Sequence, residues 1–299
     1  MDLIDGLRAF VATAQTGSFT EAASQLGISN RLTSKYVGEL EVRLGTRLFQ
    51  RTTRKVGLTP AGESLLARAP ALLDSLDDIL ADMTEESRGF SGVLRVSAPV
   101  TFGELYITGM LGRFAASHPD LTIDLQLDDR YVDLAAGGID VAFRLGRSDV
   151  LSLKSRKLGE VRSVVAASPD YLAKHGAPVT PNDLAKHAGI IDNNRRDLRK
   201  LSFWKDDKED RISLSGRFSV NSARAASELA VAGHGVVFSP AFALQDHLAA
   251  GRLTELLTDY ASETIRVNAV YLEGHDLPRK TRALIDFAVT DFRARSAEF

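Results

Sequence analysis

The chain has 299 residues, a formal net charge of −2, 44% hydrophobic residues and no cysteine. This is the composition of an ordinary globular protein, and the length suffices for two or three domains with cores of their own. The absence of cysteine excludes disulfides, thiolate metal sites and cysteine nucleophiles, and it agrees with a reducing compartment. The start MDLIDGLRAF is not a secretory signal, and no apolar run approaches the ~20 residues of a spanning helix, so we expect a cytoplasmic protein.

The amino-terminal stretch predicts three helices joined by tight turns. Residues 2–15 have one apolar helical face and predict a supporting first helix. Ser18 followed three residues later by Glu21 is a capping box, and the second helix should run from about Thr20 to Gly27. Ser29 should cap a third helix whose apolar side chains face the second helix, namely Leu32, Tyr36, Val37, Leu40 and Leu44.

Polar side chains at the start of the third helix are expected on its outer face: Asn30, Arg31, Thr33, Ser34 and Lys35. Two helices joined by such a turn form a helix-turn-helix, whose second helix presents its first polar residues to base edges in a major groove. Residues 27–55 contain seven Lys or Arg against two acids, an excess of +5 in a chain of net charge −2. The excess indicates a polyanionic partner, because a merely solvated basic face would not explain the capping box, turn and hairpin in this order.

Longer motifs run through the same stretch. The segment FTEAASQLGIS is followed by the pattern LE-x-x-LG-x-x-LF-x-R-T-x-R and then by LT-x-AG. In these motifs the chain resembles the N-terminal winged helix-turn-helix of the LysR-type transcriptional regulators, which implies binding to duplex DNA. We expect base-edge or phosphate contacts from Ser29, Asn30, Arg31, Thr33, Ser34 and Lys35. Contacts to phosphates and the minor groove are expected mainly from Thr20, Arg51, Thr52, Thr53, Arg54 and Lys55.

A linker helix should follow the hairpin, since Thr59 precedes Pro60 at a first helical position. Its apolar residues step by three and four: Leu66, Ala69, Leu73, Leu76, Leu80 and Met83. This heptad seam predicts a coiled coil that pairs two copies through residues 60–83, and an ordinary packed amphipathic helix is the alternative. Because Pro70 removes a helical hydrogen bond, we expect a kink near Leu66 or a helix that restarts there.

From residue 93 onward strands and helices alternate, after a polar hinge at residues 85–92. The alternation is typical of an α/β domain with a mostly parallel sheet. Expected strands cover residues 93–96, 121–127, 140–145, 163–167, 189–191, a segment near 212, 236–239 and 265–272. Expected helices cover residues 106–117, 169–175, 181–187, 222–232 and 279–293.

The segments DVAFRLG, ASPDYLAKHG and LAVAGHGVVFSPAFALQDHLAAGRLTELL resemble the effector-binding domain of the same family. The resemblance then covers nearly the whole chain, and it implies two α/β subdomains of the periplasmic-binding-protein kind, joined by crossings near Val161 and Arg266. We expect a DNA-binding domain at 1–59, a linker at 60–92 and an effector-binding domain at 93–299. Its first subdomain takes residues 93–161 and 267–299, and its second takes 162–266.

Ligands of α/β sheets bind beyond the carboxyl ends of the strands, where helix amino termini present free N–H groups. This rule selects residues after the first strand, at the end of DVAFRL and at a helix start in the second subdomain: Pro99, Val100, Thr101, Phe102, Arg144, Asn221 and Ser222. Thr101 also matches the position where the family commonly places a pocket hydroxyl. Phe203 and Trp204 are candidates for an aromatic wall, although a lone Trp is more often part of a core.

Arg144 indicates the chemistry of the ligand. A guanidinium at a strand end can hold a carboxylate with two hydrogen bonds, which would make the effector a small organic anion. Alternatively, Arg144 pairs with Asp140 or another structural carboxylate, and the sequence leaves both interpretations open.

No pattern in the sequence indicates catalysis, a cofactor or a metal. The six histidines have no ligand spacing, and no G-x-S-x-G elbow, P-loop or G-x-G-x-x-G motif occurs. We expect a sequence-specific DNA-binding transcription regulator, a homodimer on a pseudo-palindromic operator, controlled by a small-molecule effector. The resemblance also implies tetramers built as pairs of dimers. The competing hypothesis, an enzyme or solute receptor with an appended helical domain, would require an acid/base constellation or an export signal.

Overall fold

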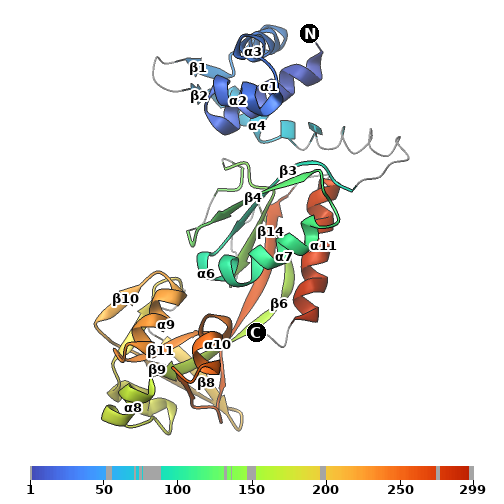
Figure 1. The fold of residues 1–299 in the computed structure, drawn as a ribbon. Helices are drawn as coiled ribbons and strands as arrows, with labels where there is room; N and C mark the ends of the chain where they lie inside the picture. Colours follow the sequence, from blue (N-terminus) through green and yellow to red (C-terminus); the bar gives the residue numbers. More distant parts are fainter. Residues whose placement is uncertain are drawn as a thin grey trace.

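The computed structural model describes residues 2–51, 56–70, 72–73, 76, 89–130, 133–135, 137–146, 153–195, 200–273 and 277–295. A small helical unit at the amino terminus is followed by two α/β bodies that lie one beyond the other (Figure 1). Among the helices in these ranges, none combines the length and the apolar character needed to span a bilayer.

The helical unit contains α1 (Leu3–Thr16), α2 (Phe19–Leu26), α3 (Asn30–Leu44), β1 (Phe49–Arg51), β2 (Val56–Leu58) and α4 (Pro60–Leu66). Its four helices begin at side-chain caps, since each of the following residues accepts a first-turn N–H: Asp2, Ser18, Ser29 and Thr59. Gly17, Gly27 and Gly45 end α1, α2 and α3 with φ of 67°, 64° and 66°, a conformation that residues with side chains rarely adopt.

The capping box predicted at Ser18 forms only in part. The Ser18 hydroxyl accepts the N–H of Glu21 at 3.3 Å, as expected. The N–H of Ser18, however, donates to the hydroxyl of Thr16 at 3.3 Å. The preceding turn therefore supplies the second acceptor, and Glu21 stays exposed in the first turn, where its charge interacts favourably with the helix dipole.

A core of its own holds the helical unit together. Phe10 of α1 packs on Phe49 of β1 with ring centroids 5.4 Å apart. Leu40 of α3 and Leu48 are buried in the same cluster. The core therefore fixes the angle between α3 and the hairpin, which the DNA-binding hypothesis requires to be constant.

The start of the predicted heptad seam packs into this core. Leu66, Ala69 and Leu73 are all buried in the cluster of the helical unit, so they are not available to pair with a second copy. For these three positions the coiled-coil prediction is wrong and the packed amphipathic helix is correct. Leu80 and Met83 lie outside the described residues.

Pro70 interrupts the linker helix as its missing N–H predicts. α4 ends at Leu66, and the N–H of Arg68 donates to Leu65 in a tighter turn. Helical bonding resumes beyond the proline, where the N–H of Leu72 donates to Arg68 at 3.3 Å. Of the hinge predicted at residues 85–92, only 89–92 are among the described residues.

The α/β part is built on a nine-stranded sheet in the order β10-β7-β11-β6-β14-β5-β3-β4, with β12 paired to β6, and a three-stranded sheet in the order β13-β8-β9. The strands are β3 (Gly92–Ala98), β4 (Leu121–Leu127), β5 (Val141–Leu145), β6 (Leu153–Ala167), β7 (Gly189–Asp192), β8 (Lys200–Lys205), β9 (Lys208–Ser213), β10 (Phe218–Val220), β11 (Val236–Pro240), β12 (Thr254–Leu256), β13 (Ala261–Ser262) and β14 (Thr264–Leu272). The helical segments are α6 (Val100–Phe102), η1 (Gly103–Ile107), α7 (Thr108–Ala115), α8 (Pro169–His175), η2 (Pro181–Lys186), α9 (Ala223–Val231), α10 (Ala241–Ala249) and α11 (Arg279–Ala294).

The expectation of a mostly parallel sheet holds within each body and fails where they join. β3 runs parallel to β4 and β5, and β7 runs parallel to β10 and β11. β6 and β14 are antiparallel, because one carries the chain into the second body and the other returns it (Figure 1). β6 pairs with β14 as far as Arg162 and with β11 from Ser163, so its partner changes between adjacent residues.

Several elements differ from their predicted bounds. The first helix of the α/β part begins at Val100 instead of near Tyr106, and η1 gives it a π-helical turn in the middle. β6 begins at Leu153, ten residues before the predicted strand, because the charged segment LKSRKLGE gives no apolar strand signal. The prediction also lacks β8, β10, β12, β13 and α10.

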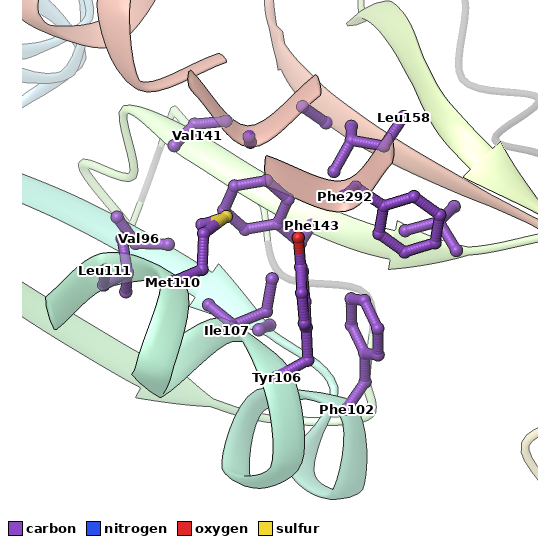
Figure 2. Close-up of a cluster of buried hydrophobic side chains, with 14 of the residues drawn as sticks. Val96, Phe102, Tyr106, Ile107, Met110, Leu111, Val141, Phe143, Leu158 and Phe292 are labelled. Atoms are coloured by element: carbon purple, nitrogen blue, oxygen red, sulfur yellow. The ribbon is translucent and has the colours of Figure 1, made fainter. Parts of the chain in front are cut away.

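Figure 2 shows the core of the first body, where side chains of the helix, a strand and α11 converge: Phe102, Tyr106, Ile107, Met110, Phe143 and Phe292. Beside it, the Tyr106 hydroxyl donates to Asp291 at 2.9 Å. Arg113 donates two hydrogen bonds to the same carboxylate, at 2.8 and 2.7 Å. These bonds tie the helix that starts at Val100 to α11.

Asp291→Asn should destabilise the protein at neutral pH by about 1–3 kcal/mol, because it weakens charge-assisted bonds to a partly buried carboxylate. Burial alone would raise the pKa of Asp291, but hydrogen bonds from Arg113 and Tyr106 outweigh it and hold that pKa below its ordinary value. The stabilisation is therefore complete above about pH 4 and is lost as the pH falls through the lower folded pKa.

Urea denaturation at about pH 7 and pH 3 checks this expectation. The deficit of Asp291→Asn should shrink at the lower pH, while Asp286→Asn, at an exposed position of α11, should match the parent protein at both. An equal deficit at both pH values would contradict the assignment.

Candidate DNA-binding face and effector cleft

The outer face of α3 carries a short hydrogen-bonded row of polar side chains. The amide of Asn30 donates to the Thr20 hydroxyl of α2 at 2.9 Å, and the Ser34 hydroxyl donates back to the Asn30 oxygen at 3.5 Å. Arg31 and Lys35 are exposed beside this row, and Lys35 makes an i,i+4 contact with Glu39 at 3.8 Å. The row orients the Asn30 amide before any partner binds.

Thr33 does not belong to this face, so its prediction as a DNA contact is wrong. Its side chain is 0% exposed, and its hydroxyl donates to the carbonyl of Ser29 at 3.1 Å. Position 33 lies on the same helical face as Val37 and Leu40, which are buried in the core. Conversely Leu44, expected to point inward, is 47% exposed. The buried stripe of α3 is therefore rotated from the predicted one.

Glu41 fastens the hairpin to the end of α3. Its Oε1 accepts the N–H of Leu48 at 2.8 Å and that of Phe49 at 3.2 Å, at the start of β1. From the sequence, Glu41 was predicted only to lower the local positive charge. It stands, however, in the LE-x-x-LG-x-x-LF motif together with Leu48 and Phe49, the two residues whose N–H groups it accepts. The motif therefore encodes a tertiary contact that a scan for helix patterns does not detect.

The other end of the hairpin is fixed by the LT-x-AG motif. The Thr59 hydroxyl donates to the carbonyl of Arg47 at 2.7 Å and accepts the N–H of Gly62 at 3.0 Å. A Cβ at Gly62 would lie 2.2 Å from the Leu48 carbonyl oxygen, so only glycine fits there. Arg51 stands opposite Val56 at the end of the β1–β2 ladder. The predicted wing contacts Thr52, Thr53, Arg54 and Lys55 lie outside the described residues.

At the end of β3, two of the predicted effector residues are half-buried and two are buried. Pro99 and Val100 are half-buried, and the N–H of Val100 donates to the Asp129 carboxylate at 3.1 Å. The Thr101 side chain is buried. Phe102 is completely buried and packs on Phe242 of α10, with ring centroids 5.3 Å apart, so it is a core residue and the prediction that it contacts the effector is wrong.

Arg144 is 7% exposed at the end of β5. Its guanidinium donates to the Phe143 carbonyl at 2.8 Å and to the Ser97 hydroxyl at 2.9 Å. Asp140, its predicted alternative partner, accepts the N–H of Arg95 at 2.7 Å. Buried guanidinium groups keep their charge, so Arg144 places a positive charge at the strand ends.

Two aspartates at the strand ends escaped the prediction. Burial, followed by the charge of Asp128, raises the pKa of Asp129, although a hydrogen bond from Val100 N–H, another from Asn194 and the charge of Arg144 oppose the rise. Burial also raises the pKa of Asp192, and the charge of Asp129 adds to it. Asp129 follows β4 and Asp192 ends β7, and the effect of the Asp129 charge on Asp192 places the two carboxylates near one another. We take the space between these strand ends as the candidate effector cleft. The strand-end rule would have selected both.

The second body carries the predicted effector residues Asn221 and Ser222 directly after β10. The Ser222 hydroxyl accepts the N–H of Ala225 and caps α9. The Asn194 amide donates to the carbonyl of Asn221 at 2.8 Å. Arg224 of α9 reaches Glu104 of η1 at 3.1 Å, which is an ion pair between the two bodies.

Phe203 does not line the cleft, so the predicted aromatic wall is wrong. It is 1% exposed on β8 and packs edge-on against Phe238, with centroids 5.8 Å apart. The three-stranded sheet that holds it was invisible in the sequence, where only a strand near residue 212 stood out. In the ranges that the structure describes, no cluster of three or more His, Asp or Glu side chains is placed to hold a metal ion.

Comparisons with known proteins agree with this architecture. Residues 4–63 match the family model "Bacterial regulatory helix-turn-helix protein, lysR family", and residues 87–293 match "LysR substrate binding domain". An uncharacterized HTH-type transcriptional regulator of Haemophilus influenzae is 35% identical over 284 residues, covering 95% of this chain and 99% of the relative. The regulator PtxR of Pseudomonas aeruginosa is 32% identical over 283 residues, 95% of this chain and 91% of its own.

Two solved structures give the same result. CrgA of Neisseria meningitidis, a LysR-type transcriptional regulator, aligns with TM-score 0.61 and 30% identity over 96% of this chain and 97% of its own. The full-length virulence activator AphB of Vibrio cholerae aligns with TM-score 0.59 and 30% identity over 97% of this chain and 99% of its own. The predicted family, fold class and non-enzymatic role are confirmed by these matches. The chain belongs to the LysR family of transcriptional regulators, with a helix-turn-helix domain followed by a substrate-binding effector domain.

Proposed function

We propose that the exposed start of α3 enters the major groove of a pseudo-palindromic duplex while the wing contacts its backbone and minor groove. The observation that carries this proposal is the row formed by Thr20, Asn30 and Ser34, with Arg31 and Lys35 exposed beside it. An amide held by two neighbours loses little freedom when it meets a base edge, which favours specific recognition. A chromosomal partner would also place the protein in the cytoplasm.

The buried Thr33 narrows the set of base-reading residues. Asn30, Arg31, Ser34 and Lys35 remain as candidates for base edges or nearby phosphates. The Ser29 hydroxyl accepts an N–H at the start of α3 and is therefore occupied as a helix cap. We expect Ser29 to help bind a DNA phosphate at the helix start and not to contact a base edge. Thr20 and the wing segment 51–55 would bind phosphates and the minor groove.

Arg31→Ala should relax sequence preference, because a guanidinium that reads a base edge discriminates against the wrong base by about 1–3 kcal/mol. Arg54→Ala should instead weaken binding to all sequences alike and lower the salt slope by about one unit, because it would remove one phosphate contact. Fluorescence anisotropy with operator and scrambled duplexes over a salt series separates the two effects. The reverse pattern would refute this division of labour.

Two copies would pair through the linker, on the face that the helical unit leaves free. Leu72 is 60% exposed on the linker, next to the buried Leu73. Since Leu66, Ala69 and Leu73 already pack within one chain, we place the homodimer contact of residues 60–83 on the side of Leu72. Such a dimer would set two α3 helices on major-groove faces about one helical turn, or a multiple of it, apart. Pairing of dimers would give the tetramer.

The effector would bind in the cleft between the strand ends of the two bodies. Arg144 is the group there that would hold a small organic anion, with Thr101, Asn221 and Ser222 near the same strand ends. Asp129 and Asp192 oppose an anion while they are ionised, so the cleft should prefer the anion when these acids are protonated. The ligand would shift the two bodies about β6 and β14, which cross near residues 161–163 and 264–266.

Arg144→Ala should abolish binding of the anionic effector, whereas Arg130→Ala, at an exposed position after β4, should leave it intact. Binding of the parent protein should also strengthen as the pH is lowered from 7, because the raised pKa values of Asp129 and Asp192 let these acids take up protons at a higher pH than an ordinary aspartate. A calorimetric screen of aliphatic and aromatic monocarboxylates measures both effects. Unchanged affinity in Arg144→Ala would eliminate the carboxylate clamp.

A further inference from the structure

A cavity of about 280 Å³ lies in the second body between β6 and the segment 255–264, and its lining includes none of Asp129, Arg144 and Asp192. Its floor is β6 at residues 162–165, where this strand changes partner from β14 to β11. Its walls come from β12, β13 and the turn between them, with Phe203 of β8 at the back. Both crossing strands therefore border the cavity.

The chain makes a detour around this cavity. β12 pairs with β6 at residues 165–167, and Thr264 of β14 rejoins the same strand opposite Arg162. Residues 257–261 leave β6, and Ala261 and Ser262 pair with Trp204 and Phe203 of β8. The chain meets β6 again at Ser262 and Glu263, which both bond to the Ser163 backbone. The space left between the detour and β6 is the cavity, so its shape follows from strand pairing.

Leu257 adopts a left-handed conformation at the start of the detour, with φ of 56°. A non-glycine residue there costs roughly 1–2 kcal/mol, and such strain persists where the surrounding structure imposes it. The conformation turns the chain away from β6 directly after β12.

The lining combines an apolar interior with one ion pair. Phe203 and Leu256 are buried and Tyr260 is half-buried. At the rim Arg162 binds both oxygens of Glu255, and the longer contact measures 3.2 Å. The hydroxyls nearby are engaged, since Ser262 donates to the Ser163 carbonyl and Thr264 donates to Glu160. Thr258 and Tyr260 are further hydroxyl-bearing residues of the lining, and its charged side chains are Arg162 and Glu255.

We propose that this cavity binds a small zwitterion with an apolar side chain, of the size of a hydrophobic amino acid. The ligand carboxylate would engage Arg162 and its ammonium would engage Glu255, so that the ligand inserts into the existing ion pair, while its side chain fills the space beside Phe203. A net anion would face Glu255 and a net cation would face Arg162, whereas a zwitterion satisfies both. The volume lies just below the usual range for drug-sized ligands, which agrees with a ligand this small. Because the crossing strands form its floor, the bound ligand would also stiffen the connection between the two bodies.

Thermal unfolding of the full-length protein tests the proposal with L-leucine and L-phenylalanine as probes. Millimolar amino acid should raise Tm by a few degrees, because a ligand bound only to the folded state stabilises it. The methyl esters lack the carboxylate and the N-acetyl derivatives lack the ammonium, so neither should shift Tm.

Two variants tie the effect to this cavity. Thr258→Trp blocks the rim and should abolish the shift, while the neighbouring Asp259→Trp, outside the lining, should retain it. Glu255→Gln keeps the shape and should weaken binding at least tenfold, which keeps the test decisive if Thr258→Trp fails to fold. No shift with either amino acid, or a shift that survives both variants and disappears in Arg144→Ala, would overturn the proposal.

Discussion

The Glu41 carboxylate sets the geometry on which DNA binding by this protein depends. It lies near the end of α3 and accepts two N–H groups at the start of β1, so the recognition helix and the wing hold a fixed relation. Each of these N–H groups would otherwise be a partly buried donor without a partner, at a cost of about 1–3 kcal/mol. The Phe10–Phe49 contact and the close approach of Gly62 to Leu48 reinforce the same junction.

A second constraint governs the regulatory half. β6 and β14 each belong to both bodies, so any relative movement of the bodies bends these strands. Beside them, the Phe102–Phe242 contact and the Arg224–Glu104 ion pair join the bodies on the helical side. The acidic pair Asp129 and Asp192 sits between, together with Arg144. In the proposed function, a ligand or proton that changes the charge balance here would act on contacts that hold the bodies together, so effector binding would move one body relative to the other.

The sequence predicts well what depends on neighbours along the chain. Helix caps such as Ser29 and Thr59, the break at Pro70 and the strands LTIDLQL and VVFS all follow from local residue types, and the structure has them. It predicts poorly what depends on rotation or long-range pairing. The burial of Thr33 instead of Leu44 is a rotation of α3 by a fraction of a turn, which only packing against α1 decides. Phe203 is buried outside the predicted effector site because β8 pairs with residues about sixty positions later in the chain, which no local pattern reveals. Asp129 was not predicted because the strand-end rule was applied to other strands and not to β4.

Hydrogen exchange combined with duplex binding tests the central claim, that the carboxylate of Glu41 holds helix and wing in a DNA-binding arrangement. In Glu41→Ala the amides of residues 47–51 should exchange at least about tenfold faster, and operator affinity should fall by a similar factor while the effector domain is unchanged. Glu39→Ala, which loses only the exposed pair with Lys35 at 3.8 Å, should show neither effect. Faster exchange with undiminished operator affinity would contradict the account.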